Sequence, residues 1–221
     1  MISELLHEIE YTMKKHIIFD FGGVLIDWHP DRVYLPYFNH DSDLMKKFYA
    51  ETNIRVLNLE FDRGLPFDHG LKQLAAKFPH YHEPIHLWKT AWHKMIGGTI
   101  DGSVEILRAL YQQNYALYGL TNWSAETFPY VYYHYDFFQC FKDIVVSGRE
   151  NVIKPESKIY EILLQRNNLE AKNCILIDDC DYNITAAEKL GIHGICFSNP
   201  EQLAEELKSL LSIHMQTAID R

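Results

Sequence analysis

The sequence lacks any apolar run long enough to cross a membrane, although 47% of its 221 residues are hydrophobic. The N-terminal stretch MISELLHEIEYTMKK also lacks the order of a signal peptide, in which basic residues precede an apolar core. There are four cysteines, and none of them stands in a C-x-x-C pair. These absences predict a cytoplasmic protein with reduced thiols and no membrane partner.

Positive charge is also scarce. Lysine and arginine total 21 against 30 aspartates and glutamates, which gives a formal net charge of -9. A nucleic-acid partner requires basic patches, so this balance predicts that the protein does not bind DNA or RNA. A small phosphorylated ligand needs only a local positive site and remains compatible with the composition. Monomer and homodimer both remain open.

From residue 101 onwards, apolar runs alternate with amphipathic stretches. The runs at 115–122, 143–148, 173–179 and 193–198 predict strands, and the stretches between and after them predict helices at 101–114, 124–135, 155–168, 183–191 and 200–213. Ser124 is the expected N-cap of the second helix, Pro155 the first residue of the third, and Gly191 the residue that ends the fourth. Continuous apolar strands separated by helices indicate a three-layer α/β fold with a parallel sheet.

Residues 31–98 follow a different pattern, because several helical stretches occur there and no strand-like run stands out. This segment is predicted to be a helical cap inserted after the first strand. The α/β core would then comprise residues 14–30 and 99–221, preceded by an N-terminal extension at 1–13.

Polar residues follow four of the predicted strands at the point where each strand ends. They are Asp20, the pair Thr121 and Asn122, Lys154, and the pair Asp178 and Asp179. Because the carboxyl ends of parallel strands meet at one edge of a sheet, these side chains are expected to share a crevice.

Three carboxylates in one crevice repel one another, which predicts a bound cation. Hard oxygen ligands at a small open site suit Mg²⁺, which commonly binds together with a phosphate. Lys154 adds a second positive charge, and the Thr121 hydroxyl can hold a phosphoryl oxygen. A carboxylate such as Asp20 can itself be the nucleophile and form an aspartyl-phosphate. Glycine after Asp20 lets the backbone approach a ligand closely, so the Gly22 carbonyl can face the metal.

At these residues the chain resembles hydrolases of the haloacid dehalogenase (HAD) superfamily, of the subfamily IA type with a helical cap. The resemblance rests on FDFGGVLIDW, LTNWS, KPESKIY and LIDDCDYN, which occur in the family's order between about Lys14 and Leu211. It implies a Rossmann-like core and a Mg²⁺-dependent phosphatase, a phosphoric monoester hydrolase. The implied substrate is a small phosphorylated metabolite such as a sugar phosphate.

The resemblance also assigns catalytic and substrate-binding roles. Asp20 matches the nucleophile, and Lys154 matches the lysine that neutralises both the nucleophile and the phosphoryl group. Thr121 matches the hydroxyl that binds the phosphoryl group, and Asn122 contributes a backbone donor beside it.

A second set of roles concerns the metal. Asp20, the Gly22 carbonyl and Asp179 match the direct Mg²⁺ ligands. Asp178 matches an outer-shell partner of the metal, and Asn183 a residue that orients the acidic loop.

Gly22 is a departure from the family pattern. Phosphatases of this family usually carry a second aspartate two residues after the nucleophile, which protonates the leaving group. Such an acid typically contributes about 10²–10⁴-fold in rate. A subgroup resembling bacterial sugar-phosphate phosphatases also has glycine there, and a backbone angle that aspartate reaches only with strain is one reason for it. Asp27 and Asp62 are the alternative acids that the sequence offers.

Two other functions remain open from the sequence. A 2-haloacid dehalogenase would use the same nucleophile without a metal, but such enzymes usually lack the acidic pair at Asp178 and Asp179. A non-catalytic phosphate-binding pseudoenzyme is compatible with the glycine at position 22.

Overall fold

A computed structural model describes residues 15–211, so the predicted N-terminal extension at 1–13 lies outside the described residues. Its centre is a five-stranded sheet in which every neighbouring pair of strands is parallel. The strands are, in spatial order, β5 (Asp143–Val146), β4 (Ala116–Thr121), β1 (His16–Phe19), β6 (Cys174–Asp178) and β7 (His193–Cys196). The predicted parallel sheet is therefore confirmed.

Both faces of the sheet are buried, which explains why its strands are continuous apolar runs. In β1, Ile17 and Phe19 belong to one hydrophobic cluster, whereas Ile18 between them belongs to a second cluster. All three side chains are fully buried. The period of two along a strand thus delivers apolar groups to both faces.

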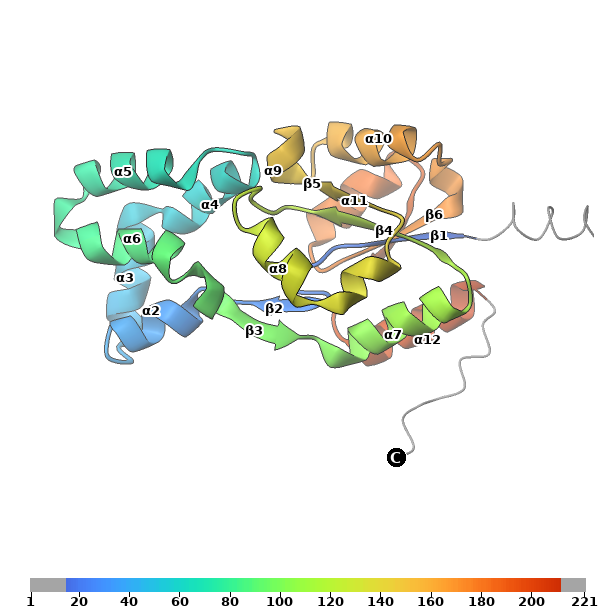
Figure 1. Cartoon of the computed structure of the whole chain (residues 1–221), viewed down its shortest axis with the longest axis horizontal. Coiled ribbons are helices and arrows are strands. Elements are labelled where there is room, and N and C mark those ends of the chain that lie inside the picture. Colours follow the sequence, from blue (N-terminus) through green and yellow to red (C-terminus); the bar gives the residue numbers. More distant parts are fainter. Residues whose placement is uncertain (1–14, 212–221) are drawn as a thin grey trace, which may run out of the picture.

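Helices cover the two faces and complete the three predicted layers (Figure 1). On one side lie α7 (Asp101–Gln112), α8 (Phe128–His134), the 3₁₀ helix η3 (Asp136–Cys140) and α12 (Pro200–Leu211). On the other side lie α9 (Ser147–Glu150), α10 (Ser157–Arg166) and α11 (Asp181–Glu188), and the 3₁₀ helix η4 (Ala171–Asn173) precedes β6. Among residues 15–211, no helix combines the length and apolar character that a bilayer span requires.

The inserted helices lie together beside the sheet (Figure 1). They are α2 (Asp31–Tyr37), α3 (Ser42–Thr52), α4 (Ile54–Asp62), α5 (Phe67–Lys77), η1 (Pro79–Tyr81), α6 (His82–Thr90) and η2 (Trp92–Met95). Two antiparallel strands, β2 (Ile26–Trp28) and β3 (Ile96–Thr99), connect them to the core. The insert therefore enters and leaves the core through one narrow ribbon.

Three local predictions were wrong. The strand β3 was not expected within 31–98, because half of its residues are glycine, which weakens a strand signal. Helix α8 begins at Phe128 rather than after Ser124, and the Ser124 hydroxyl, which accepts from the Glu126 N–H at 3.2 Å, instead caps the turn that precedes the helix. Helix α10 begins at Ser157 and not at Pro155, because both backbone groups of Lys154 are bonded to a side chain.

The C-terminal end of α11 follows the prediction. Gly191 has a φ of 85°, a left-handed conformation that glycine adopts without strain. Its N–H donates to the Glu188 carbonyl at 2.9 Å and closes the helix end. The predicted continuation of the last helix to residue 213 lies outside the described residues.

Candidate active site

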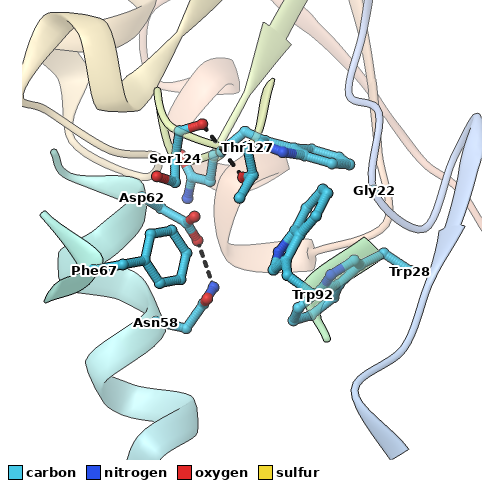
Figure 2. Close-up of a pocket in the computed structure, with 10 residues that line it drawn as sticks. Gly22, Trp28, Asn58, Asp62, Phe67, Trp92, Ser124 and Thr127 are labelled. Atoms are coloured by element: carbon cyan, nitrogen blue, oxygen red, sulfur yellow. Dashed lines mark hydrogen bonds between the residues drawn. The ribbon is translucent and has the colours of Figure 1, made fainter. Parts of the chain in front are cut away.

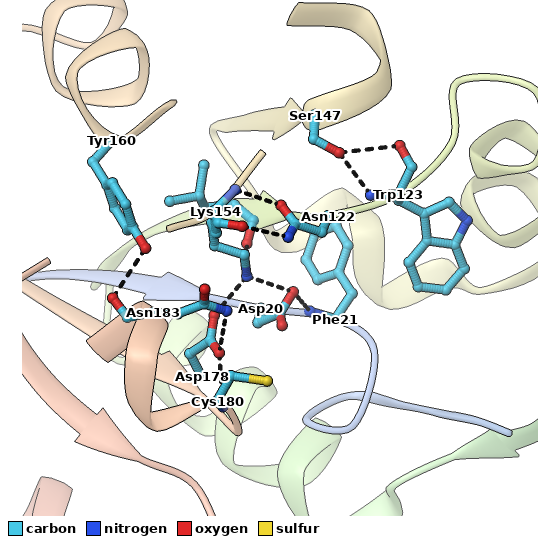
Figure 3. A network of polar contacts seen from close by, with 11 residues as sticks. Asp20, Phe21, Asn122, Trp123, Ser147, Lys154, Tyr160, Asp178, Cys180 and Asn183 are labelled. Atoms are coloured by element: carbon cyan, nitrogen blue, oxygen red, sulfur yellow. Dashed lines mark hydrogen bonds and ion pairs between the residues drawn. The ribbon is translucent and has the colours of Figure 1, made fainter. Parts of the chain in front are cut away.

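The structure brings the predicted strand-end residues together at one edge of the sheet (Figure 3). Asp20 directly follows β1, Thr121 ends β4 and Asp178 ends β6. Since β1 pairs with both β4 and β6, these three positions are neighbours. Lys154 reaches the same place from the loop between α9 and α10.

Lys154 is the centre of this polar network. Its Nζ lies 2.6 Å from Asp178 Oδ2 and 3.0 Å from Asp20 Oδ1. It also donates to the Leu120 carbonyl at 2.9 Å. The side chain is 1% exposed, so three acceptors surround one ammonium group away from water. These bonds fix the position of the Asp20 carboxylate, whose Oδ1 also accepts from the Phe21 N–H at 2.7 Å.

Burial and charge act against each other in this network. Burial alone lowers the pKa of Lys154, but Asp178 and Asp20 more than offset this effect, so its pKa is raised and the ammonium stays charged. Burial raises the pKa of Asp20 to about 7, and Lys154 opposes this rise while Asp178 and Asp179 add to it. In the protein alone, the positive charge of Lys154 therefore does not fully stabilise the ionised form of Asp20.

Asp178 is held from several directions. Its Oδ1 accepts from the Cys180 N–H and from Asn183 Nδ2, each at 2.9 Å. The carbonyl of Asn183 in turn accepts from the Tyr160 hydroxyl at 3.0 Å. Asn183 thus contacts the acidic loop that it was predicted to orient. Tyr160 has no sequence signal for this position, because it lies on α10, far from the loop in sequence.

Asn122 contacts Lys154 through its side chain. Its Oδ1 accepts from the Lys154 N–H at 2.7 Å, and its Nδ2 donates to the Lys154 carbonyl at 3.0 Å. The sequence had suggested only a backbone donor at this residue. The paired bonds hold the backbone that carries the lysine, so Asn122 positions Lys154.

The Thr121 hydroxyl has no hydrogen-bond partner among the described residues, although the residue is only 1% exposed. A buried hydroxyl without a partner costs free energy, about 1–3 kcal/mol. It lies at the end of the strand next to Asp20, where a ligand oxygen would satisfy it.

Gly22 and Gly23 differ in whether the structure requires glycine at their position. Gly23 has a φ of 77°, and a Cβ there would overlap the Asp179 carboxylate. Gly22 does not have a positive φ, and a Cβ there would meet only the Trp123 ring, at 3.7 Å. Backbone conformation therefore requires glycine at position 23, whereas position 22 can accept a Cβ. The backbone strain that was considered as a reason for glycine at 22 applies instead to position 23.

The two alternative acids occupy different environments. The Asp27 side chain is 45% exposed and is paired with Arg32. Asp62, the last residue of α4, lines the same cleft as Asp20 and Gly22. Burial raises the pKa of Asp62 to about 7; a backbone hydrogen bond from Ser124 opposes this rise and the charge of Asp20 adds to it.

Asp62 lies at a junction between the inserted helices and the core. The Ser147 hydroxyl donates to the Asp62 carbonyl at 2.5 Å, and Arg63 Nη1 lies 2.5 Å from Glu156 Oε1. At the start of α5, the Phe67 N–H donates to Glu126 Oε1 at 2.8 Å. We call these three contacts the junction.

The cleft that contains these residues has a volume of about 400 Å³. A smaller hollow beside it, the aromatic pocket, is lined by Trp28, Phe67, Trp92 and Trp123 (Figure 2). Trp88 lines the cleft as well, so all four tryptophans of the chain contribute to this region. Nothing in their sequence spacing indicated that they would converge.

Comparisons with known proteins identify the family of this chain. The profile of the haloacid dehalogenase-like hydrolase family matches residues 17–197. A sesquiterpene phosphatase from Aspergillus oryzae is 28% identical over 211 residues, covering 90% of this chain and 98% of that protein. The mouse acyl-CoA dehydrogenase family member 10 is 34% identical over 79 residues, which cover 36% of this chain and 7% of that protein.

Solved structures show the same fold. A magnesium complex of a HAD family enzyme from Bacteroides thetaiotaomicron superimposes with a TM-score of 0.68 at 17% identity, covering 88% of this chain and 98% of that one. The chain belongs to the haloacid dehalogenase-like hydrolase family and is a hydrolytic enzyme with phosphatases among its relatives.

Proposed function

We propose that this protein is a Mg²⁺-dependent phosphatase that hydrolyses a small phosphorylated metabolite through an aspartyl-phosphate on Asp20. The observation that carries the proposal is the Asp20 carboxylate, held at the sheet edge by the buried ammonium of Lys154. A fixed carboxylate of this kind can attack phosphorus in line with the leaving oxygen. Water then hydrolyses the aspartyl-phosphate and regenerates Asp20.

The residues at the site fit a magnesium ion. Asp20, Asp178 and Asp179 face a single buried ammonium, that of Lys154, and burial together with neighbouring carboxylates raises the pKa of both Asp20 and Asp179. Hard oxygen donors short of positive charge favour Mg²⁺. Asp20, the Gly22 carbonyl and Asp179 would hold the ion, with Asp178 behind them.

The protein's own groups handle the phosphoryl oxygens. Lys154 Nζ, already 3.0 Å from Asp20, can donate to an oxygen of the attacked phosphoryl group. The unpaired Thr121 hydroxyl supplies a second donor. Mg²⁺, when bound, supplies positive charge that stabilises the same oxygens.

The metal assignment predicts complete dependence on a divalent cation. Chelation should abolish hydrolysis of an aryl phosphate, and Mg²⁺ should restore it. Asp179→Asn should raise the Mg²⁺ concentration needed for half-maximal rate by about 10-fold or more, because it removes one charged ligand. Steady-state rates over a Mg²⁺ titration measure both effects. Full activity of metal-free protein on a 2-haloacid would instead identify a dehalogenase, and absence of any turnover would favour a phosphate-binding pseudoenzyme.

The cleft also constrains the substrate class. Of the described residues that line it, two are permanently cationic, Lys154 and Arg55, and Arg55 is already paired with Asp31 at 2.8 Å. The rest of the wall includes indole rings, the side chains of His29 and Asn58, and the carboxylate of Asp62. The leaving group is therefore uncharged, with a face that packs on an aromatic ring. Sugar monophosphates and hydrocarbon-rich phosphates both meet this requirement, and the relative's description as a sesquiterpene phosphatase supports the second.

This electrostatic argument predicts the outcome of a substrate panel. A second anionic group on the leaving alcohol should lower kcat/KM by at least about 10-fold, since it meets Asp62 without a free cation. Sugar 1-phosphates and prenyl phosphates, compared with carboxylated or doubly phosphorylated analogues of similar size, provide the measurement. Equal kcat/KM for charged and uncharged analogues would contradict the prediction.

A further inference from the structure

Asp62 is the one carboxylate in the cleft that neither the nucleophile nor the predicted metal site uses. It does not lie on the core sheet but at the end of α4 in the inserted helices. Even so, it shares the cleft with Asp20 and shares both the cleft and the aromatic pocket with Gly22 (Figure 2). Gly22 is the position at which the resemblance to the family places the general acid.

The position of the Asp62 carboxylate is fixed from two sides. Its Oδ2 accepts from Asn58 Nδ2 at 2.8 Å, one helical turn earlier on α4. A backbone hydrogen bond from Ser124 reaches it from the core. Its own carbonyl accepts from the Ser147 hydroxyl at 2.5 Å, also from the core. Two hydrogen bonds therefore hold the carboxylate, and a third holds the main chain that carries it.

We propose that Asp62 is the general acid and base of this enzyme and replaces the aspartate that is missing at Gly22. The inference rests on the proposed function. As Asp20 attacks phosphorus, the bond from phosphorus to the leaving oxygen breaks with its electron pair on oxygen, and the Asp62 proton moves to that oxygen. Asp62, now a carboxylate, takes a proton from the water that attacks the aspartyl-phosphate. The bond from phosphorus to Asp20 breaks, and both carboxyl groups return to their starting state.

The surroundings of Asp62 support both protonation states. Burial and the negative charge of Asp20 favour the neutral acid, whereas the Ser124 hydrogen bond favours the carboxylate. Its pKa of about 7 places both forms within reach near neutral pH, where a general acid and base works best. Lys154, the cation of the polar network, is already paired with Asp20 and Asp178.

Asp27, the other alternative, lacks these features. It is paired with Arg32 and does not line the cleft or the aromatic pocket. An exposed carboxylate that is paired with an arginine outside the cleft is not placed to reach a leaving oxygen at Asp20. Asp27 therefore serves as a matched control.

The test compares leaving groups that need a proton with those that do not. Asp62→Asn should lower kcat/KM for an alkyl phosphate by about 10²–10⁴-fold, the usual contribution of a general acid. For p-nitrophenyl phosphate, which releases a stable phenolate, kcat/KM should fall by less than about 10-fold, because kcat/KM does not report the later hydrolysis step. The variant should also show a burst of nitrophenolate, since its aspartyl-phosphate is hydrolysed slowly.

A second variant distinguishes the loss of a general acid from a structural effect of Asp62→Asn. Position 22 accepts a Cβ without a clash or a strained backbone, so adding Gly22→Asp to Asp62→Asn should restore at least about 10-fold of the lost kcat/KM on the alkyl phosphate. Asp27→Asn should leave the leaving-group dependence unchanged.

Several outcomes would overturn the assignment. An equal loss of kcat/KM on both substrates in Asp62→Asn would mean that Asp62 only shapes the site. No loss on either substrate would exclude it from catalysis, and a leaving-group-dependent loss in Asp27→Asn would transfer the role. Failure of the proposed function itself looks different, because wild-type protein would then turn over neither phosphate or would do so without Asp20.

Discussion

Replacing Asp20 by asparagine is expected to abolish turnover, with kcat reduced by about 10⁴-fold or more, because the amide cannot form the covalent intermediate. The fold should survive, since the substituted group lies at the sheet edge and Lys154 keeps Asp178 and the Leu120 carbonyl as partners. Rates on p-nitrophenyl phosphate and the melting temperature together measure the two effects. Acid-quenched wild-type protein should carry phosphate from a radiolabelled substrate, and Asp20→Asn protein should carry none.

The matched control for this experiment is Asp27→Asn, which removes a carboxylate seven residues later without touching the cleft. Its rate should remain within about 3-fold of wild type, as expected for an exposed ion pair. Substantial turnover by Asp20→Asn would falsify the assignment of the nucleophile.

Replacing Lys154 by methionine is expected to have the largest effect on stability. The substitution keeps an unbranched side chain, one atom shorter, but leaves the Asp20 and Asp178 carboxylates buried without their common cation. Losing one member of a buried ion pair costs about 3–5 kcal/mol in the free energy of unfolding. Activity should fall by about 10²-fold or more, because a charge that stabilises the transition state is lost. Urea unfolding in the presence of a chelator measures the stability without a contribution from bound metal.

The stability deficit of Lys154→Met should depend on pH. Burial already raises the pKa of Asp20 to about 7, and removal of the opposing lysine raises it further. A carboxyl group with a higher pKa in the folded state binds more protons there, so the free energy of unfolding rises as pH falls. The deficit should therefore shrink between about pH 9 and pH 7 and change little below that range, because the wild-type Asp20 then takes up a proton as well. The exposed Lys158→Met is the control, and it should change the free energy of unfolding by less than about 0.5 kcal/mol at either pH. A deficit that is small, or that grows on acidification, would contradict the prediction.

The parallel sheet and its reactive edge could be predicted from the sequence because both depend on local patterns. Apolar runs identify the strands, and a parallel sheet gathers their carboxyl ends whatever the loops between them do. Asp20, Thr121 and Asp178 therefore fall together once the strands are recognised. Lys154 follows for a similar reason, since it comes soon after β5.

The position of Asp62 could not be predicted, because it depends on how the inserted helices sit against the core. That arrangement is set by contacts between distant segments, such as Arg63 with Glu156, which leave no trace in local periodicity. The same holds for the tryptophans around the aromatic pocket. Gly22 and Gly23 show a finer limit: adjacent glycines look alike in a sequence, and only the backbone angles show which of them must be glycine.

The junction couples the position of Asp62 to the contact between the inserted helices and the core. The Ser147 hydroxyl that bonds to the Asp62 carbonyl belongs to the core, so any swing of α4 away from α9 breaks this bond and withdraws the Asp62 carboxylate from Asp20. In an open molecule Asp20 would stay in place while Asp62 moved away from it. The two proton transfers that we propose for Asp62 would then take place only while α4 lies against α9, so the movement that admits substrate or releases alcohol would also interrupt catalysis.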